Sequence, residues 1–268
     1  MRAVNRPQSW WGWHGWDQPV PLSIVEIIQA GTLPPRLAAA FWLGIERGAS
    51  FIFAAEPPGA GKTVLLTALL PFAPRDALAY FTRGWGETFD LPPRDNSVPT
   101  YILVNEMSDD IPAYSWGPYV IRIFELVAEG YSMATTMHAD TAEEVADILG
   151  EEIGVPPDHL ALLTFVVPLT FRYRGGRPLR RVLEATLFEL KDGELALRRL
   201  ATWDEASDSF SVLDSPESLA ALAGRLRMSE RELIEEMKRR ESLLRKLLNE
   251  GVSEIDAVQD AIEGFVQS

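Results

Sequence analysis

A glycine-rich loop ahead of a Lys-Thr pair constrains this chain more than any other feature. The loop, EPPGAGKT at residues 56–63, follows the apolar run Phe51–Ala55 and precedes the helix-like stretch Val64–Leu70. Strand, glycine loop, Gly-Lys-Thr and helix is the order that a phosphate-binding P-loop requires. Its backbone N–H groups close around a polyphosphate, and the positive helix end adds to the attraction. The alternative is a strand–turn–helix whose glycines serve only the turn.

The P-loop interpretation assigns a role to each residue near the turn. Lys62 would reach the β- and γ-phosphates, and the Thr63 hydroxyl would hold Mg²⁺. One position departs from the pattern, which begins with Gly where this chain has Glu56; that carboxylate is compatible with a triphosphate only if it points away. The residues expected to contact the nucleotide are Pro58, Gly59, Ala60, Gly61, Lys62, Thr63 and Val64.

Composition narrows the classes of partner. The 268 residues are 47% hydrophobic and 24% charged, which is typical of a globular protein that buries a full core. A net charge of −14 argues against non-specific binding to nucleic acid or to an anionic membrane. The chain has no cysteine, so it has neither disulfides nor a thiolate metal site. The longest apolar run, residues 161–171, is too short to cross a bilayer, so we expect any membrane association to use a partner.

Strands alternate with helices through the first part of the chain, which favours an α/β fold with a mostly parallel sheet flanked by helices. The expected strands are Phe51–Ala55, Ala77–Thr82, Thr100–Val104 and Met133–Met137. The expected helices are Ser23–Ala30, Pro34–Arg47, Val64–Leu70, Ile121–Ala128 and Ala142–Leu149.

The later part of the chain changes character. Three further strands are expected at Leu162–Tyr173, Arg180–Leu190 and Glu194–Trp203, and then helices at Glu217–Arg225, Ser229–Asn249 and Ser253–Phe265. We therefore divide the chain into a leader (1–17), a P-loop core (18–210) and a helical C-terminal region (211–268). The leader crowds Trp10, Trp11, Trp13 and Trp16 among glycines. It is either a tail that folds onto the body or an aromatic docking segment for a partner.

Two further motifs follow the P-loop. The segment YILVNE ends an apolar strand with Glu106, as a Walker-B-like element does when it brings a carboxylate beside Mg²⁺ and the γ-phosphate. The segment TTMHAD runs a strand into His138, and a helix follows. A lone histidine is usually structural, but at this place it could sense the γ-phosphate or contact a neighbouring subunit.

In this order the motifs resemble the type II/type IV secretion ATPases, a superfamily that includes the motors of type IV pili, archaeal flagella, tight-adherence pili and conjugation systems. The archaeal-pilus and tight-adherence branch is the most similar. Beyond the motifs, the resemblance includes SIVEIIQAGTLPPRLAAAFWLGIERGAS before the P-loop and ELVAEGYSMATTMHAD around His138. It covers residues 20 to 265, roughly.

The resemblance implies a RecA-like ATPase core that binds ATP and Mg²⁺ and works as a hexameric ring. Gly59, Gly61, Lys62 and Thr63 would bind nucleotide and metal, Glu106 would be the Walker B glutamate, and His138 the His-box histidine. Such a motor is cytoplasmic and drives pilin assembly or export. It is held at the inner face of the membrane by a membrane-embedded platform protein. The catalytic residues would be Lys62, Glu106 and His138, and Thr63 and Glu106 would bind the metal.

The sequence also departs from the family. Aligned on Glu87, the two acids of the family's Asp box fall on Arg83 and Gly84. The family's large N-terminal domain is represented only by the short leader. Further motif positions also differ, namely Glu56, Val64, Asn105 and the pair Ser108-Asp109. Loss of a catalytic carboxylate can cost several orders of magnitude in rate.

These departures support a rival of another class, a non-hydrolysing relative that docks on an active ATPase as a structural or regulatory subunit. Retention of Lys62, Thr63, Glu106 and His138 argues against it. If hydrolysis persists, Glu87 is the candidate substitute carboxylate. A small-molecule kinase is a third option, but the sequence shows neither an acceptor site nor a lid.

Five arginines surround the pair Gly175-Gly176. They form either a solvated hairpin or a source of an arginine that reaches a neighbouring subunit's γ-phosphate. The five are Arg172, Arg174, Arg177, Arg180 and Arg181.

Overall fold

The computed structural model describes residues 1–5, 21–95 and 97–266. The predicted tryptophan-rich leader lies mostly outside the described residues, including all four of its tryptophans. The first residues are described, and Arg2–Ala3 form a short strand, β1, that pairs in parallel with β3 (Leu78–Phe81). Asn5 extends this contact, because its side-chain amide exchanges two hydrogen bonds with the Phe81 backbone, at 2.8 and 2.9 Å. The start of the chain thus adds to one edge of the sheet.

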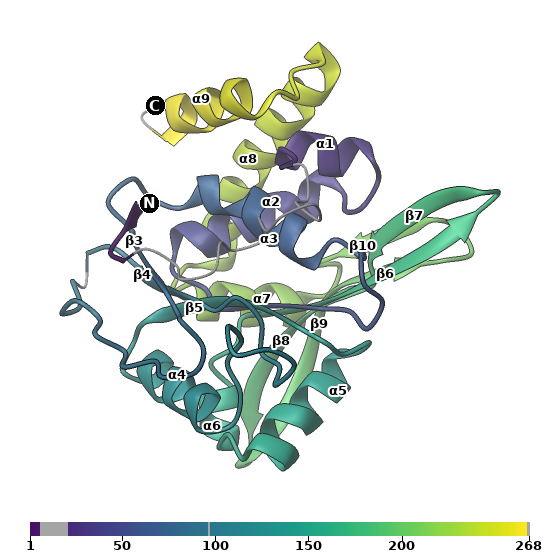
Figure 1. Cartoon of the computed structure of the whole chain (residues 1–268). Coiled ribbons are helices and arrows are strands. Elements are labelled where there is room, and N and C mark those ends of the chain that lie inside the picture. The colour runs from purple at the N-terminus through teal and green to yellow at the C-terminus, as the bar shows by residue number, and fades with distance from the viewer. Residues whose placement is uncertain (6–20, 96, 267–268) are drawn as a thin grey trace.

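One sheet crosses the molecule and changes direction part-way (Figure 1). From β1 through β6 neighbouring strands are parallel, and from β6 to β10 they are antiparallel. The parallel half continues beyond β3 with β4 (Thr100–Leu103), β5 (Ser132–Met137), β2 (Phe51–Ala54) and the start of β6 (Phe165–Arg174). The antiparallel half consists of the end of β6 together with four whole strands. These are β7 (Arg177–Val182), β8 (Glu184–Lys191), β9 (Glu194–Asp204) and β10 (Ser209–Val212).

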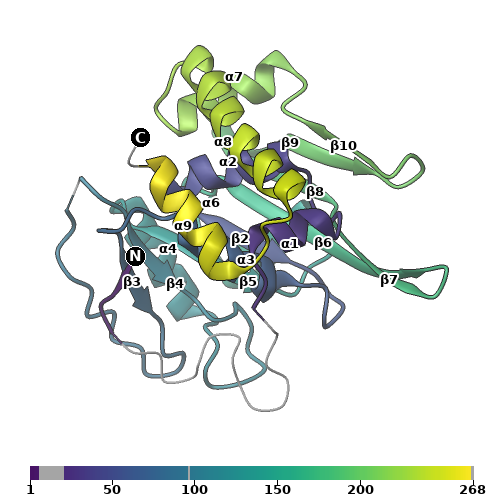
Figure 2. The same cartoon turned by 90° about the horizontal axis from the view of Figure 1, so that it is seen from above.

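Helices cover both faces of the sheet (Figures 1 and 2). One face carries α1 (Ile24–Gln29), α2 (Pro35–Glu46), α3 (Lys62–Leu69), the short turn η2 (Leu70–Phe72) and the C-terminal α7 (Pro216–Arg225), α8 (Glu230–Glu250) and α9 (Ile255–Val266). The other face carries α4 (Pro118–Ala128), α5 (Ala142–Asp147), a π-helical turn η3 (Ile148–Ile153) and α6 (Pro157–Leu160).

Strand β2 divides two hydrophobic clusters. Phe51 and Phe53 face the cluster beneath α1–α3, whereas Ile52 and Ala54 face the cluster against α4–α6. Successive side chains of a strand point to opposite faces, so four consecutive apolar residues can be buried on both sides. All four residues of β2 are buried. The strand before the P-loop is therefore held between two cores.

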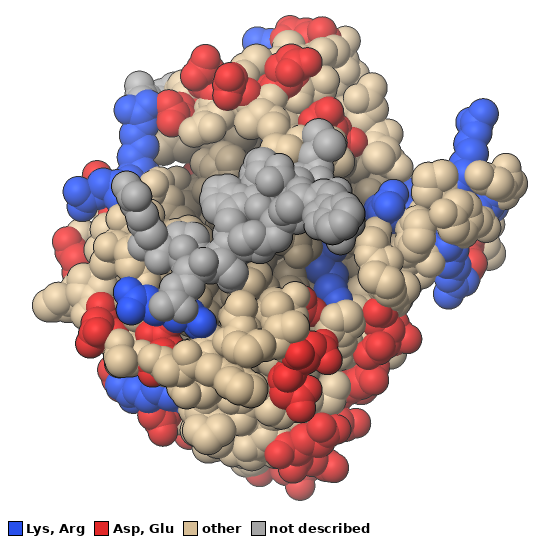
Figure 3. Space-filling view, in the orientation of Figure 1, with Lys and Arg blue, Asp and Glu red and all other residues tan. Residues whose placement is uncertain are grey.

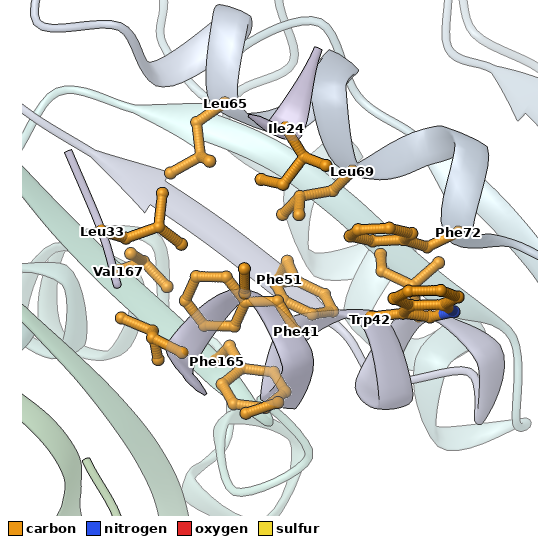
Figure 4. Packing of buried hydrophobic residues seen from close by; sticks show 14 of the residues in the cluster. Ile24, Leu33, Phe41, Trp42, Phe51, Leu65, Leu69, Phe72, Phe165 and Val167 are labelled. Carbon is orange, nitrogen blue, oxygen red and sulfur yellow. The ribbon is translucent and has the colours of Figure 1, made fainter. Parts of the chain in front are cut away.

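Aromatic rings fill the cluster beneath α2 (Figure 4). The ring of Phe41 meets those of Phe51 and Phe165 edge to face, with centroids 5.7 and 5.1 Å apart. Trp42 stacks on Phe72 at 4.6 Å. Edge-to-face and offset-stacked rings are the arrangements that the aromatic quadrupole favours. This packing fixes α2 against β2, β6 and η2.

The C-terminal helices join the same cluster. Leu233, Leu244 and Leu247 of α8 are buried in it. Arg240 of α8 pairs with Glu46 of α2 and lies over the Trp42 ring, 5.5 Å from its centroid. The Trp42 indole N–H also donates to Glu46, at 2.7 Å. Since Arg240 is buried, its paired carboxylate offsets the cost of desolvating the guanidinium.

The predicted α/β class, the mostly parallel central sheet flanked by helices and the helical C-terminal region are confirmed. The expectation of one strand over Arg180–Leu190 is wrong, because β7 and β8 are separate strands on either side of Leu183. The Leu183 N–H donates to the carbonyl of Pro168, a residue of β6 that has no N–H of its own for a ladder. Strand β10 and helix α6 were not predicted from the sequence. Within the described residues, no helix is long and apolar enough to cross a membrane.

Candidate functional site

The P-loop joins β2 to α3 through two glycines in the left-handed region. Gly59 has φ +78° and Gly61 has φ +99°, conformations that other residues adopt only with strain. Gly61 is the N-cap of α3, and no side chain caps the helix. The first N–H groups of α3 therefore point out of the helix without side-chain acceptors, which is the arrangement that binds anions.

Three predicted residues follow neighbouring strands. Lys62 lies beyond β2, His138 follows β5, and Glu106 lies just beyond β4. The strands are parallel and adjacent, in the order β4, β5, β2. Because parallel strands end at the same edge of a sheet, and ligands of open α/β sheets bind outside those ends, the topology brings the three side chains together.

Lys62, Glu106 and His138 lie together in one cluster. Lys62 Nζ lies 3.6 Å from Glu106 Oε1, and His138 Nε2 lies 2.8 Å from the same oxygen. Lys62 Nζ also donates to the Ala55 carbonyl at 2.7 Å and lies 3.4 Å from His138 Nδ1. The side chains of Lys62 and Glu106 are 11% and 12% exposed and that of His138 is 38% exposed, so the cluster opens to solvent on the histidine side.

The contacts assign the histidine tautomer. Lys62 can only donate, so Nδ1 of His138 is the acceptor and the ring proton is placed on Nε2, beside Glu106. Despite this short separation, Glu106 Oε1 is a buried atom without an aligned hydrogen bond to any described residue. We therefore treat the contact between His138 and Glu106 as electrostatic, with an acceptor lone pair of Glu106 still available.

Burial and nearby carboxylates act on Lys62 in opposite directions. Burial lowers the pKa of Lys62, while Glu106, and then Glu56 and Asp110, act to raise that pKa. Glu56 is exposed, and its backbone N–H donates to Asp140 at 3.3 Å. The surroundings of Lys62 thus contain three carboxylates that a bound polyphosphate would have to compete with.

Tyr114 is a member of the site that sequence reasoning missed. Burial, and then the charge of Glu106 and a hydrogen bond to it, raise the pKa of Tyr114 to about 12. The tyrosine lies in the loop after β4, whose backbone is tied to the site by a 3.0 Å hydrogen bond from the Ser115 N–H to the Glu106 carbonyl. No motif spacing marks this tyrosine, because an irregular loop brings it to the carboxylate.

The segment at residues 81–90 is organised around Glu87. Both oxygens of Glu87 are engaged: one accepts from the Tyr80 hydroxyl at 2.6 Å and from the Phe89 N–H at 2.7 Å, and the other accepts from the Arg83 N–H at 2.7 Å. Glu87 is buried. The proposed substitute base is therefore a structural clamp that holds its own loop.

Gly84 could not be replaced by an acid in this conformation. A Cβ on Gly84 would lie 2.1 Å from the Pro112 carbonyl oxygen, and its φ is +78°. The Trp85 N–H donates to the same oxygen at 2.8 Å. Arg83, the other aligned position, is exposed. In this loop, position 84 must be glycine.

The arginine cluster belongs to a hairpin that projects from the sheet, residues 169–182, which we call the arm (Figure 1). Basic side chains gather along it (Figure 3). Most pair with nearby acids: Arg172 with Glu205 at 2.7 Å, and Arg181 with Asp208 at 2.9 Å. Arg180 instead turns to the P-loop of its own chain, where its Nε donates to the Gly59 carbonyl at 2.8 Å.

Thr63 and Glu106 are reasonable ligands for Mg²⁺. Glu106 offers the buried oxygen without an aligned donor, and Thr63 begins α3 beside Lys62. Among the described residues no group of three His, Cys, Asp or Glu is arranged to hold a metal. Mg²⁺ keeps several waters and is usually held by one or two protein ligands together with substrate phosphates.

No protein-family model matches the chain. The chain is 24% identical over 252 residues to the uncharacterized protein MJ1287 of Methanocaldococcus jannaschii, covering 83% of this chain and 90% of that protein. It is also 24% identical over 286 residues to the uncharacterized protein MJ0900 of the same organism. That match covers 92% of this chain and spans about half, 49%, of the relative.

Among solved structures, the chain is similar to the ATPase DotB of Legionella pneumophila. The sequence identity is 16%, the TM-score is 0.39, and the match covers 86% of this chain and 58% of DotB. At this TM-score the two backbones superpose only in part.

Proposed function

We propose that this chain binds Mg·ATP at the P-loop and hydrolyses it to ADP and phosphate. One observation carries the proposal. Three separate sequence motifs place polar atoms of Lys62, Glu106 and His138 within 3.6 Å of one another, at the N-terminal end of α3. A structural turn would not require a lysine and a carboxylate that are both mostly shielded from solvent at the same helix terminus, where both are partly desolvated.

The side chains have distinct roles in this proposal. Lys62 would leave the Ala55 carbonyl and stabilise charge on the β- and γ-phosphates, and Thr63 would hold Mg²⁺ with Glu106 near it. When bound, Mg²⁺ would neutralise charge that develops on the phosphate oxygens. The available lone pair of Glu106 would orient the attacking water and receive its proton. His138, at the open side of the cluster, would couple the phosphate to its surroundings.

The proposed biological role follows from the family resemblance. The chain would serve a secretion or pilus-assembly apparatus as an ATPase that assembles into a hexameric ring. It would work in the cytoplasm, beside a membrane-embedded platform protein. The segment organised around Glu87 favours one alternative, a non-hydrolysing subunit that binds nucleotide and docks on a related ATPase.

Turnover and affinity measured together test the proposal. We expect Mg·ATP turnover by the full chain, a loss of about 10²–10⁴-fold in Glu106→Gln with affinity kept, and weakened ATP binding in Lys62→Ala. Arg172→Gln, an exposed change on the arm, is the matched control and should behave as the unmodified protein. Binding without turnover in the unmodified chain would establish the non-hydrolysing alternative. Absence of binding, or unchanged affinity in Lys62→Ala, would refute the nucleotide site.

A further inference from the structure

We propose that Arg180 is a positioning residue that presets the P-loop of its own chain for phosphate. The inference rests on the proposed nucleotide site and identifies a residue outside its motifs. The arginine lies on β7, more than a hundred residues after the loop, and makes a 2.8 Å hydrogen bond from Nε to the Gly59 carbonyl. This is an intrachain role, different from the delivery of an arginine to a neighbouring subunit.

The Arg180 side chain is held on two sides. Its guanidinium lies over the ring of Phe171, 4.6 Å from the centroid, and the two residues face each other across the β6–β7 ladder. The aromatic face fixes the plane of the guanidinium, and the Gly59 carbonyl fixes its direction. A side chain restrained in this way loses less conformational freedom when it orders a neighbour than a mobile one would.

The contact acts through the peptide plane of the loop. In a planar trans peptide the carbonyl and the next N–H point in opposite directions. Because Arg180 fixes the direction of the Gly59 carbonyl, it also fixes the opposite direction of the Ala60 N–H, which is one of the candidate phosphate donors of the loop. Gly59 has no side chain to restrain this peptide, and a Cβ placed there would meet nothing within 4 Å. On the other side of this peptide the Ala60 side chain is buried in the hydrophobic cluster, so Arg180 restrains the Gly59 end, which has no packing of its own.

The rest of the guanidinium adds a second positive charge beside the loop, in addition to Lys62. Within the described chain, the two terminal nitrogens of Arg180 donate no hydrogen bond, and the side chain passes 3.6 Å from the position of a Cβ on Gly61. Glu56, Glu106 and Asp110 act on Lys62 from the other sides. Arg180 thus offsets local negative charge while it orients the peptide.

The test compares Arg180→Ala with Arg172→Ala, which removes another arginine from the same hairpin but only an exposed pair with Glu205. Affinity for Mg·ATP and for inorganic pyrophosphate is measured by calorimetry. We expect Arg180→Ala to weaken both by about tenfold, as loss of one hydrogen bond to an ordered group does, and Arg172→Ala to change neither. Guanidinium ion at a non-denaturing concentration should restore part of the affinity of Arg180→Ala, and Arg180→Lys should restore less because it lacks the planar fork.

Amide hydrogen exchange without nucleotide separates this inference from the nucleotide site. Arg180→Ala should speed exchange in residues 59–62, and Arg172→Ala should not. If the unmodified chain binds pyrophosphate but no ATP, and affinity and exchange respond in this way, the proposed function fails and the positioning role stands. If nucleotide binds equally well to both variants, or exchange in the loop is unchanged, the positioning role is wrong. A loss of affinity with no rescue by guanidinium and a lowered melting temperature would also overturn it.

Discussion

The two halves of the sheet differ in how deeply their strands are buried. In the parallel half, β2, β4 and β5 are buried along their whole length, and their ends bring Lys62, Glu106 and His138 to one place. In the antiparallel half, β7 and β9 have exposed and half-buried residues along most of their length, and the arm projects into solvent. Burial on both faces fixes strand ends tightly enough to build a site, whereas one solvated face lets a strand pair extend beyond the core.

The largest expected effect on stability comes from comparing one aromatic residue in each half of the sheet. Phe51→Ala should lower the free energy of unfolding by about 3–5 kcal/mol, because a ring packed against Phe41 and Phe165 is removed and a cavity remains. Tyr173→Ala in the arm removes a ring that is 71% exposed and should change stability by less than about 0.5 kcal/mol. Urea denaturation of both variants checks this; similar losses would show that the arm is part of the cooperative core.

The next effect compares two glycines with the same φ of +78°. Gly84→Ala should destabilise the chain by about 2–4 kcal/mol, because a methyl group overlaps the Pro112 carbonyl and the left-handed backbone adds strain. Gly59→Ala meets no neighbour and should cost only the strain, about 1–2 kcal/mol. Thermal unfolding in the absence of nucleotide measures both, and an equal shift would contradict the packing of the loop around Gly84.

Glu87→Gln tests the hydrogen bonds by which Glu87 holds its own loop, in the parallel half of the molecule. We expect a loss of about 1–3 kcal/mol, because the amide group that replaces one carboxylate oxygen cannot accept the hydrogen bonds that this oxygen receives. Turnover per folded molecule should not change, since Glu87 has no oxygen free for water. A selective loss of turnover with unchanged stability would return Glu87 to the role of substitute base.

The smallest effect belongs to the antiparallel half and depends on pH. Hydrogen bonds from Arg181 and Trp203 lower the pKa of Asp208 from 3.8 to about 2. A carboxyl whose pKa is lower in the folded state contributes stability in full above 3.8, and loses it as the pH falls through about 2. Asp208→Asn should therefore be slightly less stable than the unmodified chain at neutral pH, and the difference should vanish near pH 2. A difference that persists in acid would show that geometry, and not charge, is responsible.

The positions of the motif residues could be predicted from short-range order in the sequence. The P-loop glycines, the apolar run before Glu106 and the strand before His138 are local patterns, and parallel topology turns them into one cluster. Reasoning failed where long-range packing decides. The break between β7 and β8 depends on Pro168 in another strand, and the contact of Tyr114 with Glu106 depends on an irregular loop. Arg180 was recognised only as a member of a charged cluster, since nothing in its neighbourhood indicates that it reaches Gly59.

Strand β2 is a junction as well as a support. Its four residues pair on one side with β5, which leads to His138, and on the other with β6, which leads to the arm and Arg180. The segments that carry Lys62, His138 and Arg180 are therefore all anchored to one strand of four residues, and their relative positions at the P-loop depend on its register.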